Sequence, residues 1–201
     1  MLGETSETMM HKMEELMKSE KAITKAAVED YCPEPFFYID KVKFDEEEAT
    51  RFVAYTQDDA LLGSLIERLL DILPNRLEVL LKVAKEEISD EVKWDRYYGK
   101  VTKDTLAKVV SANFDYLLHD GSHEFCVKVE DSGEYFAIDD HAIVFIYSSK
   151  PEYEDALVDL GFEQRQNPLI FDGPHWHVIL RESKALQKRL IKTLELKSIG
   201  E

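Results

Sequence analysis

The spacing of apolar residues changes near residue 117, and this change limits the folds that are open to the chain. Before residue 117, apolar side chains recur every three or four positions, as the leucines of residues 61–73 do. After it, apolar and polar side chains alternate, as they do in residues 125–129. The first spacing matches one face of a helix, and the second matches one face of a strand. The sequence therefore predicts a helical first half and a second half that forms a sheet.

The first half is predicted to hold several helices and one strand. Phe36 to Phe44 has the irregular alternation of a strand, whereas Asp45 followed by Glu48 forms a pattern that caps helices. Pro74 interrupts the helical spacing, which predicts a pair of helices joined as a hairpin. The predicted helices cover residues 9–28, a segment that begins at Asp45, and residues 58–73, 77–88 and 103–117.

The second half is predicted to begin with a meander of three strands over residues 125–147. Its turns carry Asp131-Ser132-Gly133 and Asp139-Asp140, which are typical turn residues. The third strand, Ala142 to Tyr147, is apolar on both faces, which indicates a central strand. A capping box at Ser149 predicts a helix that ends at a left-handed Gly161, and a hairpin and a last helix from Ser183 follow.

The predicted fold class is therefore α+β, with a helical N-terminal half followed by an antiparallel sheet in the order βββαββα. Strands that are grouped along the chain, and do not alternate with helices, favour this class. We expect a mainly helical subdomain over residues 1–117, with one strand near residues 36–44, and an antiparallel α+β subdomain over residues 118–201. A chain of 201 residues is long enough for both to share one core.

The charge of the chain is strongly negative and unevenly placed. The formal net charge is −16. Residues 29–59 hold ten acidic and three basic side chains, and residues 114–163 hold thirteen acidic and two basic ones. Nucleic acid requires a basic footprint that releases counterions, so we expect no direct nucleic-acid binding. A basic protein would be steered toward such a surface, although solubility alone also accounts for the charge.

The sequence also predicts the cellular location of the protein. Residues 1–15 lack the apolar run of a signal peptide, and the longest apolar run, Ala142 to Tyr147, is too short to span a bilayer. The two cysteines, Cys32 and Cys126, do not resemble the dense disulfide framework of a small secreted protein. The expected location is therefore the cytoplasm, with no membrane partner.

Carboxylates at successive turns of the predicted meander form the first candidate site. They are Glu130, Asp131, Asp139 and Asp140. Charges on such a face set the rate and the salt dependence of association with a basic partner. The sequence therefore predicts an acidic protein-interaction module that binds a basic protein, in the manner of an inhibitor or immunity protein, and a merely solvated face is the alternative.

Histidines form the second candidate site. His175 and His177 lie two apart in a predicted strand, so both side chains point to one face, and Asp139 and His141 have the same spacing. Two imidazoles and a carboxylate are suitable ligands for a divalent metal ion, which would acidify a bound water. The alternative function is therefore a metal-dependent enzyme, although two histidines separated by one residue are a weak motif on their own.

Other catalytic signatures are missing from the sequence. It contains no Gly-x-Ser-x-Gly elbow and no glycine-rich phosphate loop. We therefore predict no catalytic residue, and no cofactor other than the divalent ion of the alternative site. The preferred interpretation is a binding module and not an enzyme. A third alternative is an oligomeric scaffold without activity, in which the methionine-rich first helix pairs with its copy in a homodimer.

Overall fold

The computed structural model describes residues 26–28, 34–44, 47–85, 93–166 and 175–200. Eleven strands and five helices follow one another in these residues. The first half holds β1 (Ala26–Val28), β2 (Phe36–Phe44), β3 (Glu47–Tyr55), α2 (Asp59–Ile72), β4 (Arg76–Ala84), β5 (Trp94–Thr102), α3 (Lys103–Ala112) and α4 (Phe114–His119). The second half holds β6 (His123–Val129), β7 (Tyr135–Ile138), β8 (Val144–Tyr147), α5 (Pro151–Asp159), β9 (Glu163–Gln164), β10 (His175–His177), α6 (Ser183–Thr193) and β11 (Lys197–Ile199).

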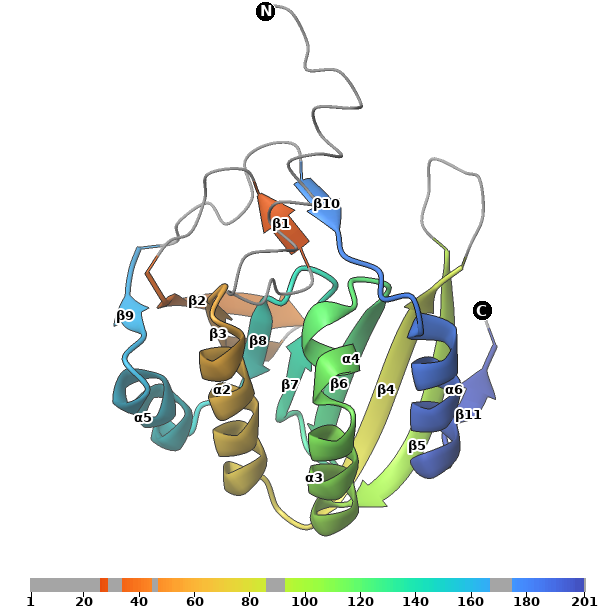
Figure 1. Ribbon diagram of the computed structural model, residues 1–201. Coiled ribbons are helices and arrows are strands. Elements are labelled where there is room, and N and C mark those ends of the chain that lie inside the picture. Colours follow the sequence, from red (N-terminus) through yellow and green to blue (C-terminus); the bar gives the residue numbers. More distant parts are fainter. Residues whose placement is uncertain (1–25, 29–33, 45–46, 86–92, 167–174, 201) are drawn as a thin grey trace, which may run out of the picture.

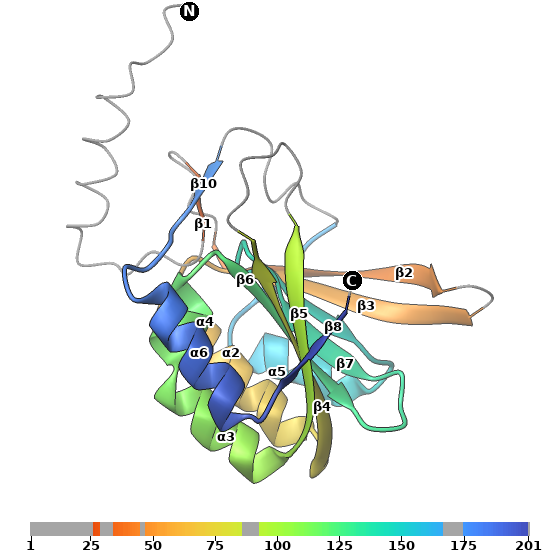
Figure 2. The ribbon, with the colours of Figure 1, turned by 90° about the vertical axis from the view of Figure 1, so that its right-hand side faces the viewer.

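Nine of the strands form one sheet, in the order β11-β5-β4-β6-β7-β8-β3-β2-β9. Every neighbouring pair is antiparallel except β2 and β9, which are parallel, so the sheet is mixed. Helices α2, α3, α4 and α6 cover one face of this sheet (Figures 1 and 2). A separate two-stranded sheet pairs β1 with β10. Among the described helices, none has both the length and the apolar character needed to cross a membrane.

The predicted fold class is wrong, because the N-terminal half is not helical. The segment predicted as a helix over residues 77–88 begins with strand β4, and the helix expected after Asp45 is replaced by β3. Residues 26–28 form β1, whereas the rest of the predicted first helix, and the homodimer proposed through it, lie outside the described residues. The second half does contain its elements in the order βββαββα, followed by β11, but they do not form a sheet of their own. Strands β6, β7 and β8 share one sheet with β2 to β5, and β10 pairs with β1.

The error at β4 has a physical cause. Leu77, Val79, Leu81 and Val83 point to the helix-covered face and are buried, in strict alternation. The other face carries the charged Arg76, Glu78 and Lys82, but also the apolar Leu80 and Ala84, so apolar residues occur on both sides. In such a strand, apolar residues also recur every three and four positions, as they do in a helix. The periodicity alone therefore does not distinguish a strand from a helix.

Other predicted elements are found in the structure. Helix α2 buries the leucine stripe of residues 61–73, and its cap Asp58 accepts a hydrogen bond from the amide of Leu61 at 3.0 Å. The predicted meander is the antiparallel set β6, β7 and β8. The helix predicted over 103–117 is divided into α3 and α4 at Asn113, whose buried side chain accepts hydrogen bonds from Arg189 of α6.

The two faces of the central strands differ in what covers them. Side chains of Phe125, Val127 and Phe136 are buried beneath the helices. The alternate positions, such as Cys126, Tyr135 and Tyr147, are only half-buried and point to the other face. This face of the central sheet therefore presents an aromatic surface, and the turn between β7 and β8 lies at one end of it.

Gly161 ends α5 with φ of 85°, as the sequence predicts. Replacing it with alanine places a Cβ in the left-handed region, where the cost is about 1 kcal/mol although no neighbouring atom is in the way. Gly133 is a matched control, because an added Cβ there also meets nothing within 4 Å and its φ is not positive. We expect Gly161→Ala to lower the free energy of unfolding in urea, and Gly133→Ala to leave it nearly unchanged. Equal effects of the two changes would contradict this explanation.

Candidate metal centre

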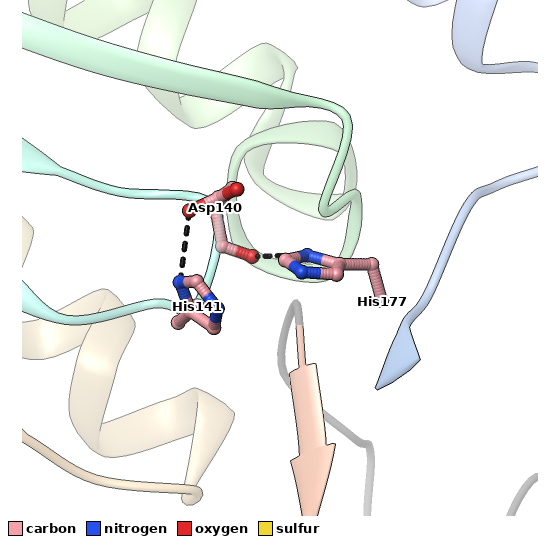
Figure 3. A group of neighbouring side chains, drawn as sticks. All are labelled: Asp140, His141 and His177. Atoms are coloured by element: carbon pink, nitrogen blue, oxygen red, sulfur yellow. Dashed lines mark hydrogen bonds and ion pairs between the residues drawn. The ribbon is translucent and has the colours of Figure 1, made fainter. Parts of the chain in front are cut away.

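Two imidazoles and a carboxylate meet where the turn between β7 and β8 approaches the end of β10 (Figure 3). Asp140 and His141 come from the turn, and His177 is the last residue of β10. Each of the three offers one ligand atom, and these atoms lie within 4.8 Å of one another. All three side chains are half-buried, so the cluster is shielded but still open to solvent. It is thus formed by segments that are far apart in the sequence.

The turn itself is shaped by Asp139. Its carboxylate accepts hydrogen bonds from the amides of His141 at 2.9 Å and Ile143 at 2.8 Å. Within this turn Ala142 is fully buried and has φ of 64°, a conformation that costs about 1 kcal/mol for a residue with a Cβ. Such a residue persists only where its surroundings determine it, and such residues are often found near functional sites. Asp139 thus orients its neighbours, and Asp140 supplies the carboxylate of the cluster.

The ring of His177 is held by the backbone of the same turn. Its Nδ1 lies 3.0 Å from the carbonyl oxygen of Asp140. Because a carbonyl oxygen only accepts hydrogen bonds, Nδ1 is the donor and Nε2 of the neutral ring carries the lone pair. Metal-binding histidines are commonly oriented by such a bond from the second ring nitrogen. The rings of His177 and His141 meet edge to face with centroids 4.7 Å apart.

His141 lies beside two carboxylates. Its Nδ1 lies 3.5 Å from a carboxylate oxygen of Asp139 and 2.8 Å from one of Asp140. Hydrogen bonds to these two carboxylates raise the pKa of His141 to about 10, which outweighs the opposite effect of burial. Burial acts to raise the pKa of Asp140, but His141 and His177 outweigh it and lower that pKa. The cluster without an ion therefore holds a proton that a metal ion has to displace.

The dimensions of the cluster define what binding requires. Zinc ligands lie about 2.1 Å from the ion, so two donor atoms on one ion are at most about 4.2 Å apart. The donor atoms here extend to 4.8 Å from one another. In the tetrahedral geometry that zinc prefers, donor atoms on one ion are about 3.4 Å apart, so side-chain movements of about 1 Å are needed to close the set around an ion. Half-buried side chains at a turn have the freedom for such a movement.

A buried carboxylate, Asp120, holds the segment after His177 in place. One of its oxygens accepts a hydrogen bond from the amide of Leu180 at 3.0 Å, and the other accepts from the amide of Ser122 at 2.9 Å and from the Ser122 hydroxyl. The neighbouring amide of Gly121 donates to the carbonyl of Val178 at 2.7 Å. Residues 178–180 are therefore fixed to the turn that precedes β6.

His123 completes the surroundings of this carboxylate. Its ring is fully buried, stacks on Tyr116 with centroids 4.2 Å apart, and places Nδ1 3.9 Å from Asp120. Burial acts to raise the pKa of Asp120. The nearby ring of His123 and hydrogen bonding by the serines outweigh it and lower that pKa to about 2. The carboxylate is thus charged at neutral pH although it has no exposed surface.

Two pockets meet at the cluster. A pocket of about 570 Å³ lies on the helix-free face and is lined by Asp139, His141 and the aromatic side chains of β7 and β8. A second pocket of about 470 Å³ is lined by His177 and by the start of α6. Asp140 lines both pockets. Cys126 at the floor of the first has its pKa raised to about 11 by burial, so it is a neutral thiol at physiological pH.

The residues predicted as ligands are partly brought together. His141 and His177 meet, and Asp139 adjoins them. His175 lies in β10, two residues before His177, but its side chain lies outside the described part of the chain. Asp140, which the sequence predicts to contact a partner, is the carboxylate that lies in the cluster.

The four carboxylates predicted to bind a partner lie at opposite ends of β7. Glu130 and Asp131 precede this strand, whereas Asp139 and Asp140 follow it. Glu130 is also paired with Arg76 and Lys100, each at 2.6 Å. These residues therefore do not form one continuous acidic patch. The role of Asp120 was missed, because only the partner segment around Leu180, distant in the sequence, reveals it.

Comparison with known proteins gives no identification. The chain matches no family model, no curated protein and no solved structure.

The pKa of Asp120 predicts how acid affects stability. The pKa in the folded chain, about 2, lies below the ordinary value of 3.8, so the charged carboxylate stabilises the fold at higher pH. This contribution, about 2 kcal/mol, is fully present above pH 4 and is lost as the pH falls toward 2. Urea unfolding at a series of pH values measures it. We expect Asp120→Asn to be less stable than the natural chain at pH 6, with a difference that shrinks between pH 4 and pH 2. A difference independent of pH would contradict this assignment.

Proposed function

We propose that this chain is a metal-dependent hydrolase whose centre is Asp140, His141 and His177. The observation that carries the proposal is the convergence of two imidazoles and a carboxylate, from separate segments, at the junction of two pockets. We assign Zn²⁺ as the ion, because imidazole nitrogen and carboxylate oxygen are among its usual ligands. Three protein ligands leave one position of a tetrahedral ion for water, as catalytic zinc sites require.

The chemistry that follows is hydrolysis. A bound zinc ion lowers the pKa of its water to about 7, so hydroxide is available at neutral pH. Asp140, His141 and His177 would hold the ion, which would supply an acidified water as the nucleophile; its hydroxide would replace the leaving group on the substrate, and its proton would pass to that group. The hydrogen bond from His177 Nδ1 to the carbonyl of Asp140 supports the role of its Nε2 as ligand.

Metal binding by the full chain, purified without a histidine tag, tests the proposal. Isothermal titration with Zn²⁺ should show one site per chain. His141→Ala, His177→Ala and Asp140→Asn should each weaken binding by at least about tenfold, because each removes one ligand or its charge. Hydrolysis of generic ester substrates should depend on the same three residues.

His119→Gln is the control for this titration. His119 lies in α4, with Nε2 3.5 Å from Asp59, and does not belong to the cluster. Its variant should bind Zn²⁺ as the natural chain does. The proposal fails if the natural chain binds no stoichiometric metal, or if the control loses binding as strongly as the three ligand variants.

As a second candidate, we propose an acidic module that binds a basic protein. The observation that favours it is a groove of about 590 Å³ between α2 and α5, where Arg68 is the one basic residue among the described lining residues. The acidic residues of this groove are Asp71, Glu152, Glu154, Asp155 and Asp159. An exposed Val158 beside them offers apolar contact area.

Salt dependence tests this second candidate. A complex held by surface charges weakens as ionic strength rises, because the screening length falls to about 8 Å at 0.15 M. We expect protein captured by the immobilised chain at low salt to be released at moderate salt. We also expect the Glu154→Lys/Asp155→Lys variant not to capture it. Capture that is unaffected by salt and by the charge reversal would count against the module.

A further inference from the structure

The pocket beside His177 has the opposite charge to the chain as a whole. Three basic side chains line it: Lys85, Arg181 and Lys184. Among its described lining residues, Asp140 is the only carboxylate, and it is paired with His141 at 2.8 Å. The whole chain carries a net charge of −16. A local concentration of positive charge in so acidic a chain indicates a site for an anion.

The basic groups come from separate elements. Lys85 directly follows β4, with Nζ 3.3 Å from Asp95, and Arg181 and Lys184 stand on either side of the first residue of α6. Arg181 is exposed and forms no ion pair with any described residue. Two parts of the fold, the end of β4 and the start of α6, therefore contribute the basic groups.

Hydroxyl groups and apolar side chains complete the pocket. The hydroxyls of Ser122 and Ser183 lie 3.2 Å apart at its wall. The Ser122 hydroxyl already donates to Asp120, so Ser183 is the hydroxyl whose proton can turn to an anion. Trp94 and Ile179 supply apolar surface, and Ile179 is 57% exposed. Such a combination of a few polar groups with apolar walls is typical of small-molecule sites.

We propose that this pocket binds the phosphoryl group of a small phosphorylated substrate and places it beside the metal centre. The inference rests on the proposed function, because it assigns a substrate class to the same site. A phosphoryl group carries a charge of about −1.5 to −2 at pH 7 and three acceptor oxygens, which suits three basic groups, of which Lys85 is shared with Asp95, and the hydroxyl of Ser183. A carboxylate carries one charge and is matched less well. Arginine is also well suited to phosphate, since its planar group can form two parallel hydrogen bonds.

The exclusion of nucleic acid is consistent with this assignment. A polynucleotide has to contact an extended basic surface along its backbone. Here the basic groups are confined to one pocket of about 470 Å³, and the rest of the chain is strongly acidic. A single phosphoryl group on a small molecule enters such a pocket without bringing a second phosphate against the acidic surface.

Binding of inorganic phosphate and of phenyl phosphate to the full chain tests the inference. The two are titrated with and without Zn²⁺, and acetate at equal ionic strength reports carboxylate binding. We expect both phosphates to bind without the metal and acetate to bind at least about tenfold more weakly. Arg181→Glu/Lys184→Glu should weaken phosphate binding by at least about tenfold, and the milder Lys184→Ala should weaken it less. Circular dichroism checks that each variant is folded.

Lys188→Glu is the matched control, because Lys188 is exposed on the same helix but does not line the pocket. Equal losses in Lys188→Glu and in the pocket variants would overturn the inference, as would acetate binding as tightly as phosphate. Phosphate that fails to bind to a chain that does bind Zn²⁺ overturns the substrate class and leaves the metal centre standing. Phosphate bound through Arg181 and Lys184 in a chain that binds no Zn²⁺ supports the anion pocket and overturns the metal centre alone.

Discussion

The buried carboxylate of Asp120 is the interaction on which the arrangement of the site depends. It has no exposed surface, yet it stays charged because backbone amides and a hydroxyl surround it. A buried charge without such donors would be strongly destabilising. One of the amides belongs to Leu180, so the carboxylate ties the segment that follows His177 to the turn before β6. The position of His177 relative to Asp140 and His141 thus follows from a bond made at some distance from the cluster.

The other half of the cluster depends on the sheet. Strand β8 pairs with β3 from the first half of the chain and with β7, so the turn between β7 and β8 stands at a fixed end of the central strands. Asp139 closes this turn, and Ala142 accepts an unfavourable φ within it. Burial of Ala142 holds the turn in this shape. The turn between β7 and β8 and the segment after β10 are therefore each held in place where they meet, while the side chains of the cluster can still change rotamer.

Local patterns predicted the elements that are marked by a one-sided apolar stripe or by turn residues. Helix α2 was predicted correctly because its apolar stripe lies on one side, and the meander because its turn residues mark each reversal. Strand β4 was predicted wrongly because apolar residues occupy both of its faces. At the site, the spacing of His175 and His177 pointed to β10, but no local pattern indicates that Asp120 binds Leu180, since that contact joins segments about sixty residues apart.

The net charge of the chain likewise does not show where individual charged side chains lie in the fold. The total of −16 argues against an extended nucleic-acid surface, but it does not reveal that Lys85, Arg181 and Lys184 share one pocket. Arg181 and Lys184 are neighbours in the sequence, but Lys85 is about a hundred residues away, so only the fold brings it to the same pocket. Long-range repulsion by the acidic surface slows the approach of any anion, and salt screens this repulsion more strongly than contacts inside a pocket. An anion site here therefore depends on short-range contacts in the pocket and gains nothing from steering by the chain as a whole.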